Sequence, residues 1–359
     1  PETMLAMPRC SIVSFRFGPT DGVSVVAQTW ADALAGLGFK VSWVAGSFEP
    51  GWTGAGRTTT LPGPGMASDD HPDEGDLAAA LTDADLVIVE NLCSIPLNLP
   101  AARMVADLRR GRPTILHHHD PAWQRPQFAD VTELPPDDPA WRHVTINEMT
   151  RCEMAERGIT ATTIYNGFDS HPPSGDREGT RRALGVADKT ILVAHPVRAI
   201  ARKAVDRAIA ITVAIGGTYW LTGPAEDGFG PVLAQLLAAA RCPVIHAQGR
   251  PAHDIYAAAD LIAYPSTWEG FGNPPVEAAL HHRPVVVGDY PVAAELRSMG
   301  FSWFNHDQSA EILPWLDGSD PAAHRLMIDT NKNLAVGNFS LEMVADGLKT
   351  LLDEAGWLP

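Results

Sequence analysis

The strongest constraint on the fold is an alternation of short apolar segments, rich in valine, isoleucine and aromatic residues, with stretches of helical periodicity. Each apolar segment is followed by glycine or polar residues before a helical stretch begins. This order is typical of parallel α/β units. The expected strands are 10–17, 40–46, 85–91, 113–119 and 143–147 in the first half, and 190–196, 218–223, 243–249, 261–266 and 283–289 in the second.

Helical periodicity is clearest between Val23 and Leu37, where Val26, Trp30, Leu34 and Leu37 share one face. Such a helix packs on a sheet through its apolar face. Further helices are expected near 203–214, 230–241, 252–259, 291–299 and 339–357. Each half of the chain therefore predicts a doubly wound parallel sheet.

The chain has 359 residues, which is too long for one ordinary core and suits two domains. Between residues 166 and 184 the composition shifts to glycine, proline, serine and charged residues, as in a linker. We place the domain boundary at Asp169. Ligands of doubly wound sheets bind beyond the carboxyl ends of the strands, so two such domains facing each other would enclose a cleft.

Charge and composition exclude several classes of protein. A formal charge of −16 and a pI near 5.1 argue against nucleic acid as a partner. No apolar run approaches the ~20 residues of a transmembrane segment, and residues 1–8 lack a signal pattern, so a cytoplasmic protein is expected. The four cysteines are far apart and match no metal or CxxC spacing, so we expect buried free thiols. One basic cluster is either a solvated helix face or a contact for an anionic acceptor or lipid; its members are Arg103, Arg109, Arg110 and Arg112.

Gly22 lies where the first strand gives way to its helix, within the segment PTDGVSVVAQ. Free amides at a helix start bind anions, so Gly22 either contacts a phosphate or only makes the turn. The segment is not GxGxxG, and a dinucleotide fingerprint is not supported.

The segment ILHHHDPAW ends a strand with His117, His118, His119 and Asp120. Strand alternation puts His117 and His119 on one face and His118 on the other, so a three-histidine metal site is not expected. A lone histidine here is commonly a packed residue. Three polar rings at the end of a buried strand nevertheless need partners, and a cleft would supply them.

Two segments of the second half carry charge at strand ends. VRAIARK presents Arg198 and Lys203, with Arg202 between them, and these cations either bind a diphosphate or begin a surface helix. STWEGFGNPPVEAAL follows a strand and enters a helix, and we expect Asn273 to cap that helix. Its two carboxylates, Glu269 and Glu277, can accept hydrogen bonds from hydroxyl groups at separate points. The pattern indicates a ligand with two sugars.

Taken together, six segments resemble landmarks of the retaining glycosyltransferases of family 4; they are GPTDGVSV, HHHDPAW, NGFD, RAIARK, PSTWEGFG and VEAALHHRPVVV. The resemblance covers nearly the whole chain in order. It implies the GT-B fold, with two Rossmann-like domains facing a central cleft. The implied domains are an acceptor domain at 1–169, a donor domain at 170–335, and a helix at 336–359 that crosses back to the first domain.

The resemblance also implies roles for single residues. Glu277 would bind the ribose and Glu269 the transferred hexose, while Arg198 and Lys203 would neutralise the diphosphate. His119 would lie beside the reacting sugar. The amides of Gly270, Phe271 and Gly272 would support sugar and phosphate, with Gly22 helping from the facing domain; Asp21, His118 and Asp120 are possible acceptor or sugar contacts.

Asp21 stands where the family usually has a second glycine. This difference implies either weaker anion binding at that position or a contact with the acceptor instead. Pro274 and Pro275 remove two amide donors, so more phosphate charge falls on the cations. No cofactor and no metal are expected, because the DAD at 83–85 reads as an ordinary strand boundary.

The expected reaction is retaining transfer of a hexose from a nucleotide sugar to a hydroxyl of a glycoside or oligosaccharide acceptor, with GDP-mannose as the preferred donor. The alternatives are a UDP-glucose-dependent glucosyltransferase, a nucleotide-sugar epimerase of the same fold, and a non-catalytic sugar-binding protein.

Overall fold

The structure is a computed structural model that describes residues 7–19, 21–62 and 72–359. Contacts divide the chain into two compact units. Unit 1 contains Pro1–Gly167 and Leu341–Pro359, and unit 2 contains Phe168–Ser340. The predicted boundary at Asp169 is two residues beyond this division. The polar stretch 166–184 is not all linker, because Arg177–Ala183 forms helix α5.

Seven strands of the described residues form one parallel sheet in unit 1, in the order β3-β2-β1-β4-β5-β6-β7. The five predicted strands are present, and β3 and β7 were not predicted because they are short and carry little apolar sequence. The bounds are β1 Arg9–Phe17, β2 Lys40–Phe48, β3 Arg57–Thr60, β4 Leu86–Glu90, β5 Thr114–His118, β6 Trp141–Thr145 and β7 Ala161–Thr163.

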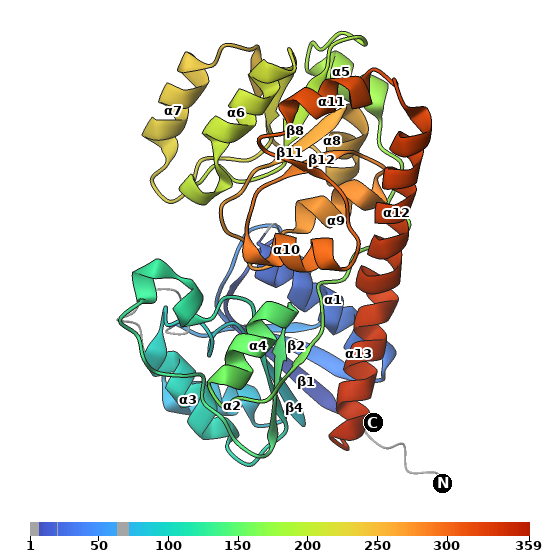
Figure 1. Cartoon of the computed structure of the whole chain (residues 1–359). Coiled ribbons are helices and arrows are strands. Elements are labelled where there is room, and N and C mark those ends of the chain that lie inside the picture. Colours follow the sequence, from blue (N-terminus) through green and yellow to red (C-terminus); the bar gives the residue numbers. More distant parts are fainter. Residues whose placement is uncertain (1–6, 20, 63–71) are drawn as a thin grey trace. The chain divides into compact units, whose positions relative to one another are not determined.

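Helices cover both faces of this sheet (Figure 1). They are α1 Gly22–Gly36, α2 Glu74–Leu81, α3 Leu99–Arg109, α4 Glu148–Glu156 and α13 Leu341–Glu354. Helix α1 buries Val26, Trp30 and Leu34 against the sheet, as its periodicity predicts. Helix α13 packs beside α1 through Val344 and Leu348. Two core layers result, one on each side of the sheet.

Unit 2 repeats the plan with six strands of the described residues, in the order β10-β9-β8-β11-β12-β13. The strands are β8 Leu192–His195, β9 Thr218–Leu221, β10 Val244–His246, β11 Leu261–Tyr264, β12 Val285–Val287 and β13 Phe304–Asn305. The helices after α5 are α6 Val205–Ala214, α7 Gly230–Ala239, α8 Ala252–Ala258, α9 Asn273–Leu280, α10 Pro291–Ser298, α11 Ser309–Leu316 and α12 Pro321–Phe339. A short 3-10 turn, η3 Ala201–Lys203, precedes α6.

Both sheets have the strand order of a classical doubly wound fold, with the direction of winding reversing beside the first strand. The reversal lies between β1 and β4 in unit 1 and between β8 and β11 in unit 2. Loops leaving the carboxyl ends of these strands diverge there and leave room for a ligand. The residues predicted to bind ligands follow these strands, or lie at the end of the neighbouring β5 and just after it.

Within the residues that the structure describes, no helix combines the length and apolar character needed to cross a bilayer. All four cysteines are free. Cys10 and Cys93 are buried as predicted, but the prediction of burial is wrong for Cys152, which is exposed, and for Cys242, which is partly exposed.

Candidate active site

The carboxyl ends of β8 and β11 bring Lys203 and Glu269 together. Lys203 Nζ donates to Glu269 at 2.6 Å and to the hydroxyl of Tyr264 at 3.1 Å. Arg202 donates to the other oxygen of Glu269 at 2.7 Å. Glu269 is 5% exposed and Lys203 is 9% exposed. A buried carboxylate therefore lies between two cations.

Burial changes the proton affinities of this group. It lowers the pKa of Lys203 from 10.5 to about 8, although the charge of Glu269 opposes the change. Burial alone would raise the pKa of Glu269, but Lys203 and Arg202 hold it below the ordinary value. Glu269 is therefore ionised at neutral pH, and Lys203 keeps its proton there largely because of Glu269.

Arg198 and Glu277 each have a protein partner in the same unit. Arg198 donates to Glu226 at 2.6 Å, and both side chains are more than a third exposed. Glu277 lies on α9 and accepts from the hydroxyl of Tyr256. Burial raises the pKa of Glu277, and the Tyr256 hydrogen bond opposes that change. The Arg198 pair is open to solvent, and the Glu277 pair is more enclosed.

The loop between Glu269 and α9 depends on Gly272. Its φ is +93°, and a Cβ there would lie 2.3 Å from the Tyr290 hydroxyl oxygen. Gly272 also precedes the first residue of α9, so Asn273 is not the N-cap that we predicted but the first helical residue. The side chain of Phe271 is buried and stacks with Phe168. The loop is thus anchored at its centre and closely packed at its end.

In unit 1, Asp21 caps α1. Its carboxylate accepts from the backbone amide of Ser24 at 3.1 Å and from the Ser24 hydroxyl at 2.8 Å. Gly22 is the first helical residue, and a Cβ there would meet no atom within 4 Å. Because a carboxylate occupies the start of the helix, a phosphate there would meet repulsion as well as amides. That Asp21 weakens anion binding here stays a prediction.

Glu90, at the end of β4, holds two of the predicted histidines. Its Oε2 lies 2.8 Å from Nε2 of His119, and its two oxygens lie 3.0 and 3.1 Å from Nδ1 of His117. All three side chains are buried. Burial would raise the pKa of Glu90, but His117 and His119 hold it down at about 2. Burial lowers the pKa of His117, so this ring is neutral at pH 7.

His118 faces the other side of β5, as strand alternation predicts. Its Nδ1 lies 2.6 Å from the hydroxyl of Ser94, and its Nε2 lies 2.9 Å from Nδ1 of His143. Nε2 of His143 in turn lies 3.1 Å from Asp137, whose side chain is 60% exposed. Both nitrogens of His118 have protein partners, so its predicted sugar contact stays a prediction that this geometry does not favour.

Asp120, the last predicted contact in this segment, is paired with Arg125. The backbone around it is fixed by Asn91, whose side-chain oxygen accepts from the amides of His119 and Asp120 at 3.1 and 3.0 Å. Asn91 itself has a φ of +60°, which is uncommon for a residue other than glycine. The strained turn after β4 therefore positions the end of β5.

Three residues have the chemistry and proximity to hold a metal ion: Glu90, His117 and His119, with one ligand atom of each within 4.8 Å of the others. Their carboxylate–imidazole distances of 2.8–3.1 Å suit N–H···O hydrogen bonds. Ligands around a tetrahedral zinc ion with bonds of ~2.0–2.1 Å lie ~3.3 Å apart, so the observed spacing favours hydrogen bonding. In the DAD segment, Asp83 and Asp85 both bond Arg9 at the amino end of the sheet.

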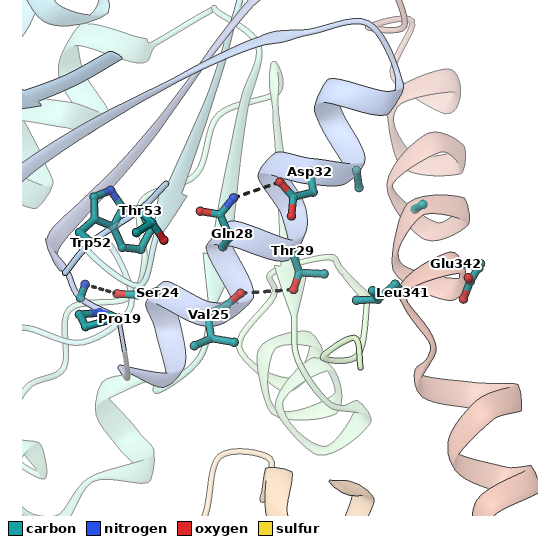
Figure 2. Close-up of a pocket in the computed structure, with 13 residues that line it drawn as sticks. Pro19, Ser24, Val25, Gln28, Thr29, Asp32, Trp52, Thr53, Leu341 and Glu342 are labelled. Atoms are coloured by element: carbon teal, nitrogen blue, oxygen red, sulfur yellow. Dashed lines mark hydrogen bonds between the residues drawn. The ribbon is translucent and has the colours of Figure 1, made fainter. Parts of the chain in front are cut away.

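Unit 1 also has a cavity of about 510 Å³ between the start of α1 and α13. Figure 2 shows Trp52 and Thr53 on one side, Gln28 and Asp32 bonded along α1, and Leu341 on α13. Indole, amide, hydroxyl and carboxylate groups commonly bind sugars in proteins. No lysine or arginine of the described residues lines this cavity.

The sequence interpretation missed Glu90, Tyr256, Tyr264 and Glu226 as partners of the predicted residues. A signal existed only for Glu90, a lone acid at the end of an apolar strand. The basic cluster is largely paired within the protein: Arg103 bonds Glu133, Arg110 bonds Asp107, and buried Arg109 bonds Thr114 and two backbone carbonyls.

Comparison with known proteins agrees with these features. A family described as "Glycosyl transferases group 1" matches residues 193–310. Mannosylglucosylglycerate synthase of Petrotoga mobilis is 26% identical, over 84% of this chain and 87% of the relative. The enzyme of the same name from Thermotoga maritima is 24% identical, over 94% and 98%.

Among solved structures, Anabaena HepE in complex with UDP-glucose has a TM-score of 0.75 and 18% identity, over 96% of this chain and 99% of that one. WaaG, a glycosyltransferase involved in lipopolysaccharide biosynthesis, has a TM-score of 0.68 and 15% identity, over 95% of this chain and 99% of that one. These likenesses, with the two doubly wound units, confirm the predicted GT-B fold. The matched segment, the two relatives and the fold together support a GT4-like glycosyltransferase.

Proposed function

We propose that the chain transfers mannose from GDP-mannose to a hydroxyl of a small glycoside, with retention of the anomeric configuration. The names of the two full-length relatives, which describe a mannosylated glucosylglycerate, support mannose and a small acceptor. The observation that carries the proposal is the Lys203–Glu269–Arg202 group beyond β8 and β11, in which Lys203 and Glu269 are buried. It supplies cations for a diphosphate and a carboxylate for sugar hydroxyls within one loop system.

In this proposal the residues that bind the donor have two kinds of role: cations bind the diphosphate, and carboxylates bind the hydroxyls of the two sugars. Lys203 and Arg198 bind the diphosphate, and their charge stabilises it as it departs. Glu277 binds the ribose hydroxyls, while Glu269 and the backbone of Gly270, Phe271 and Gly272 hold the hexose. Arg198 can change partners readily, because its pair with Glu226 is solvent-exposed.

The acceptor is assigned to unit 1. His119 lies beside the reacting sugar, and Asp21, Gly22 and Asp120 contact acceptor or donor at the strand ends. The cavity between α1 and α13 offers the carbohydrate-binding groups for the rest of the acceptor. The departing phosphate takes the acceptor proton on the same face of the sugar, so no protein nucleophile and no metal are needed.

A donor panel tests the proposal. Purified protein is incubated with GDP-mannose, UDP-glucose and ADP-glucose, with and without glucosylglycerate, in the presence and absence of EDTA. We expect transfer from GDP-mannose alone, unaffected by EDTA, and an α-linked product by proton NMR. Transfer from UDP-glucose, an epimerised donor, a β-linked product, or binding without turnover would each replace the proposal with the corresponding alternative.

A further inference from the structure

The hydrogen bonds around Glu90 define which nitrogen of each histidine carries a proton. Glu90 is ionised and therefore only accepts hydrogen bonds. The nitrogens that face it, Nδ1 of His117 and Nε2 of His119, must then be the protonated ones. Neutral His117 is left with an unprotonated Nε2, which is buried without a hydrogen-bond partner against the ring of Trp30.

For His119 the same reasoning leaves Nδ1 available. Among the described residues, no side chain or backbone group is bonded to this nitrogen. The backbone amide of His119 donates to Asn91 and ring Nε2 faces Glu90, so the residue is fixed at its backbone and at one ring nitrogen. An imidazole whose one proton lies on the nitrogen that faces the carboxylate presents a lone pair on its other nitrogen, which is a hydrogen-bond acceptor.

We propose that Glu90 is a positioning residue for the transfer reaction: it fixes His119 as the Nε2–H tautomer, so that Nδ1 accepts a hydrogen bond from a hydroxyl of the transferred sugar. The proposal rests on the proposed function for the identity of the ligand. Glu90 does not touch the substrate and acts through His119, as the carboxylate of a catalytic triad orients its histidine. His117 shares the carboxylate and keeps it from rotating away.

The geometry of neighbouring strands makes this arrangement rigid. Glu90 and His117 are direct partners in the β4–β5 pairing, so their side chains leave the sheet side by side. His119 follows two residues later, on the same face as His117. His118, between them, belongs to the separate group with Ser94 and His143.

Nitrogen-15 NMR of the imidazole rings tests the proposal without any substrate. In the wild-type protein at pH 7.5 we expect His119 in the Nε2–H form and His117 in the Nδ1–H form, with His119→Gln assigning the signals. Glu90→Met removes the acceptor and should convert or mix the His119 tautomers, while Glu90→Gln, which keeps an acceptor oxygen, should largely retain the wild-type form. Asp137→Asn, in the opposite histidine group, is the matched control and should leave His119 unchanged.

Steady-state kinetics of the same Glu90 variants provides a second test. Turnover should fall ~10²-fold or more in Glu90→Met and recover partly in Glu90→Gln, with diphosphate affinity within about twofold of wild type. An Nδ1–H tautomer of His119 in the wild type would overturn the proposal. So would one equivalent of metal that is bound to purified protein and lost in Glu90→Met. If no donor is turned over but the tautomers are as expected, the proposed function fails and the orientation by Glu90 stands.

Discussion

Replacing Glu269 with glutamine should destabilise unit 2 strongly. The substitution keeps the size of the side chain but removes the charge that faces Lys203 and Arg202. Even beside Glu269, burial lowers the pKa of Lys203 from 10.5 to about 8. That difference corresponds to ~3.4 kcal/mol against the charged ammonium. Without Glu269, the charges facing Lys203 are the cations Arg202 and Arg198.

We therefore expect the free energy of unfolding to fall by about 3 kcal/mol at pH 7, the lower end of the range for breaking a buried pair. Lys203→Met combined with Glu269→Gln should lose less than the sum of the single changes, because no unpaired ammonium remains. We expect a coupling of about 2 kcal/mol. The folded protein binds fewer protons at Lys203 than the unfolded chain, so wild-type stability should rise as pH increases from about 8 towards 10.5.

Amide hydrogen exchange measures this effect within one unit. Peptides from β8 and β11 report on unit 2, and peptides from β1 and β4 provide an internal control in unit 1. Protection should drop in β8 and β11 and stay constant in β1 and β4. If Glu269→Gln changes the opening free energy of β8 and β11 by less than ~0.5 kcal/mol, or if the single and double variants are additive, the pairing argument is wrong.

Three further predictions follow from single contacts. Glu277→Ala should weaken nucleoside and nucleoside diphosphate alike, by roughly ten- to a hundredfold in calorimetric titration, whereas unchanged nucleoside affinity would refute the ribose assignment. Burial lowers the pKa of His195 to about 3, so below pH 6.5 the folded protein binds fewer protons at this ring than the unfolded chain does. Acidification from pH 6.5 to 5 should therefore cost ~2 kcal/mol of stability. In urea titrations, His195→Gln should reduce this pH dependence. Gly272→Ala should lower the melting temperature of unit 2 through ~1–2 kcal/mol of backbone strain and a clash with Tyr290, whereas Gly22→Ala, at an open helical position, should be tolerated; equal effects would contradict the conformational argument.

The sheets were predictable because their strands carry an uninterrupted apolar signal. β4 and β11 are buried at every position, and runs such as LVIVE and LIAY are typical of buried parallel strands. The strands that escaped prediction lack this signal: β3 reads RTTT, and β13 has two residues. Helix α12 was missed because polar and apolar residues mix around it and it buries few side chains.

The partners of the site residues were much less predictable. Glu90 and His117 are 27 residues apart, and their contact follows only once β4 and β5 are known to be neighbours in a given register. Arg198 and Glu226 meet because the loop after β9 returns beside the end of β8. Sequence alternation assigned a face to each histidine of the HHH segment. It could not assign the acid that each face would meet, since that depends on the order of the strands.

Lys203 and Glu269 show why two residues that are both predicted to bind a ligand can pair with each other in its absence. Each was predicted to hold a different part of the ligand, yet they form a 2.6 Å ion pair. A lysine that is 9% exposed needs a counter-charge whatever its function, and a neighbouring carboxylate is the least costly one within a loop. Under the proposed assignment, a diphosphate at Lys203 would supply a second negative charge, raise the proton affinity of the amine and free part of Glu269 for a sugar hydroxyl. The two parts of the ligand would then be coupled through one ion pair, and we predict that the affinity for the sugar depends on the presence of the diphosphate.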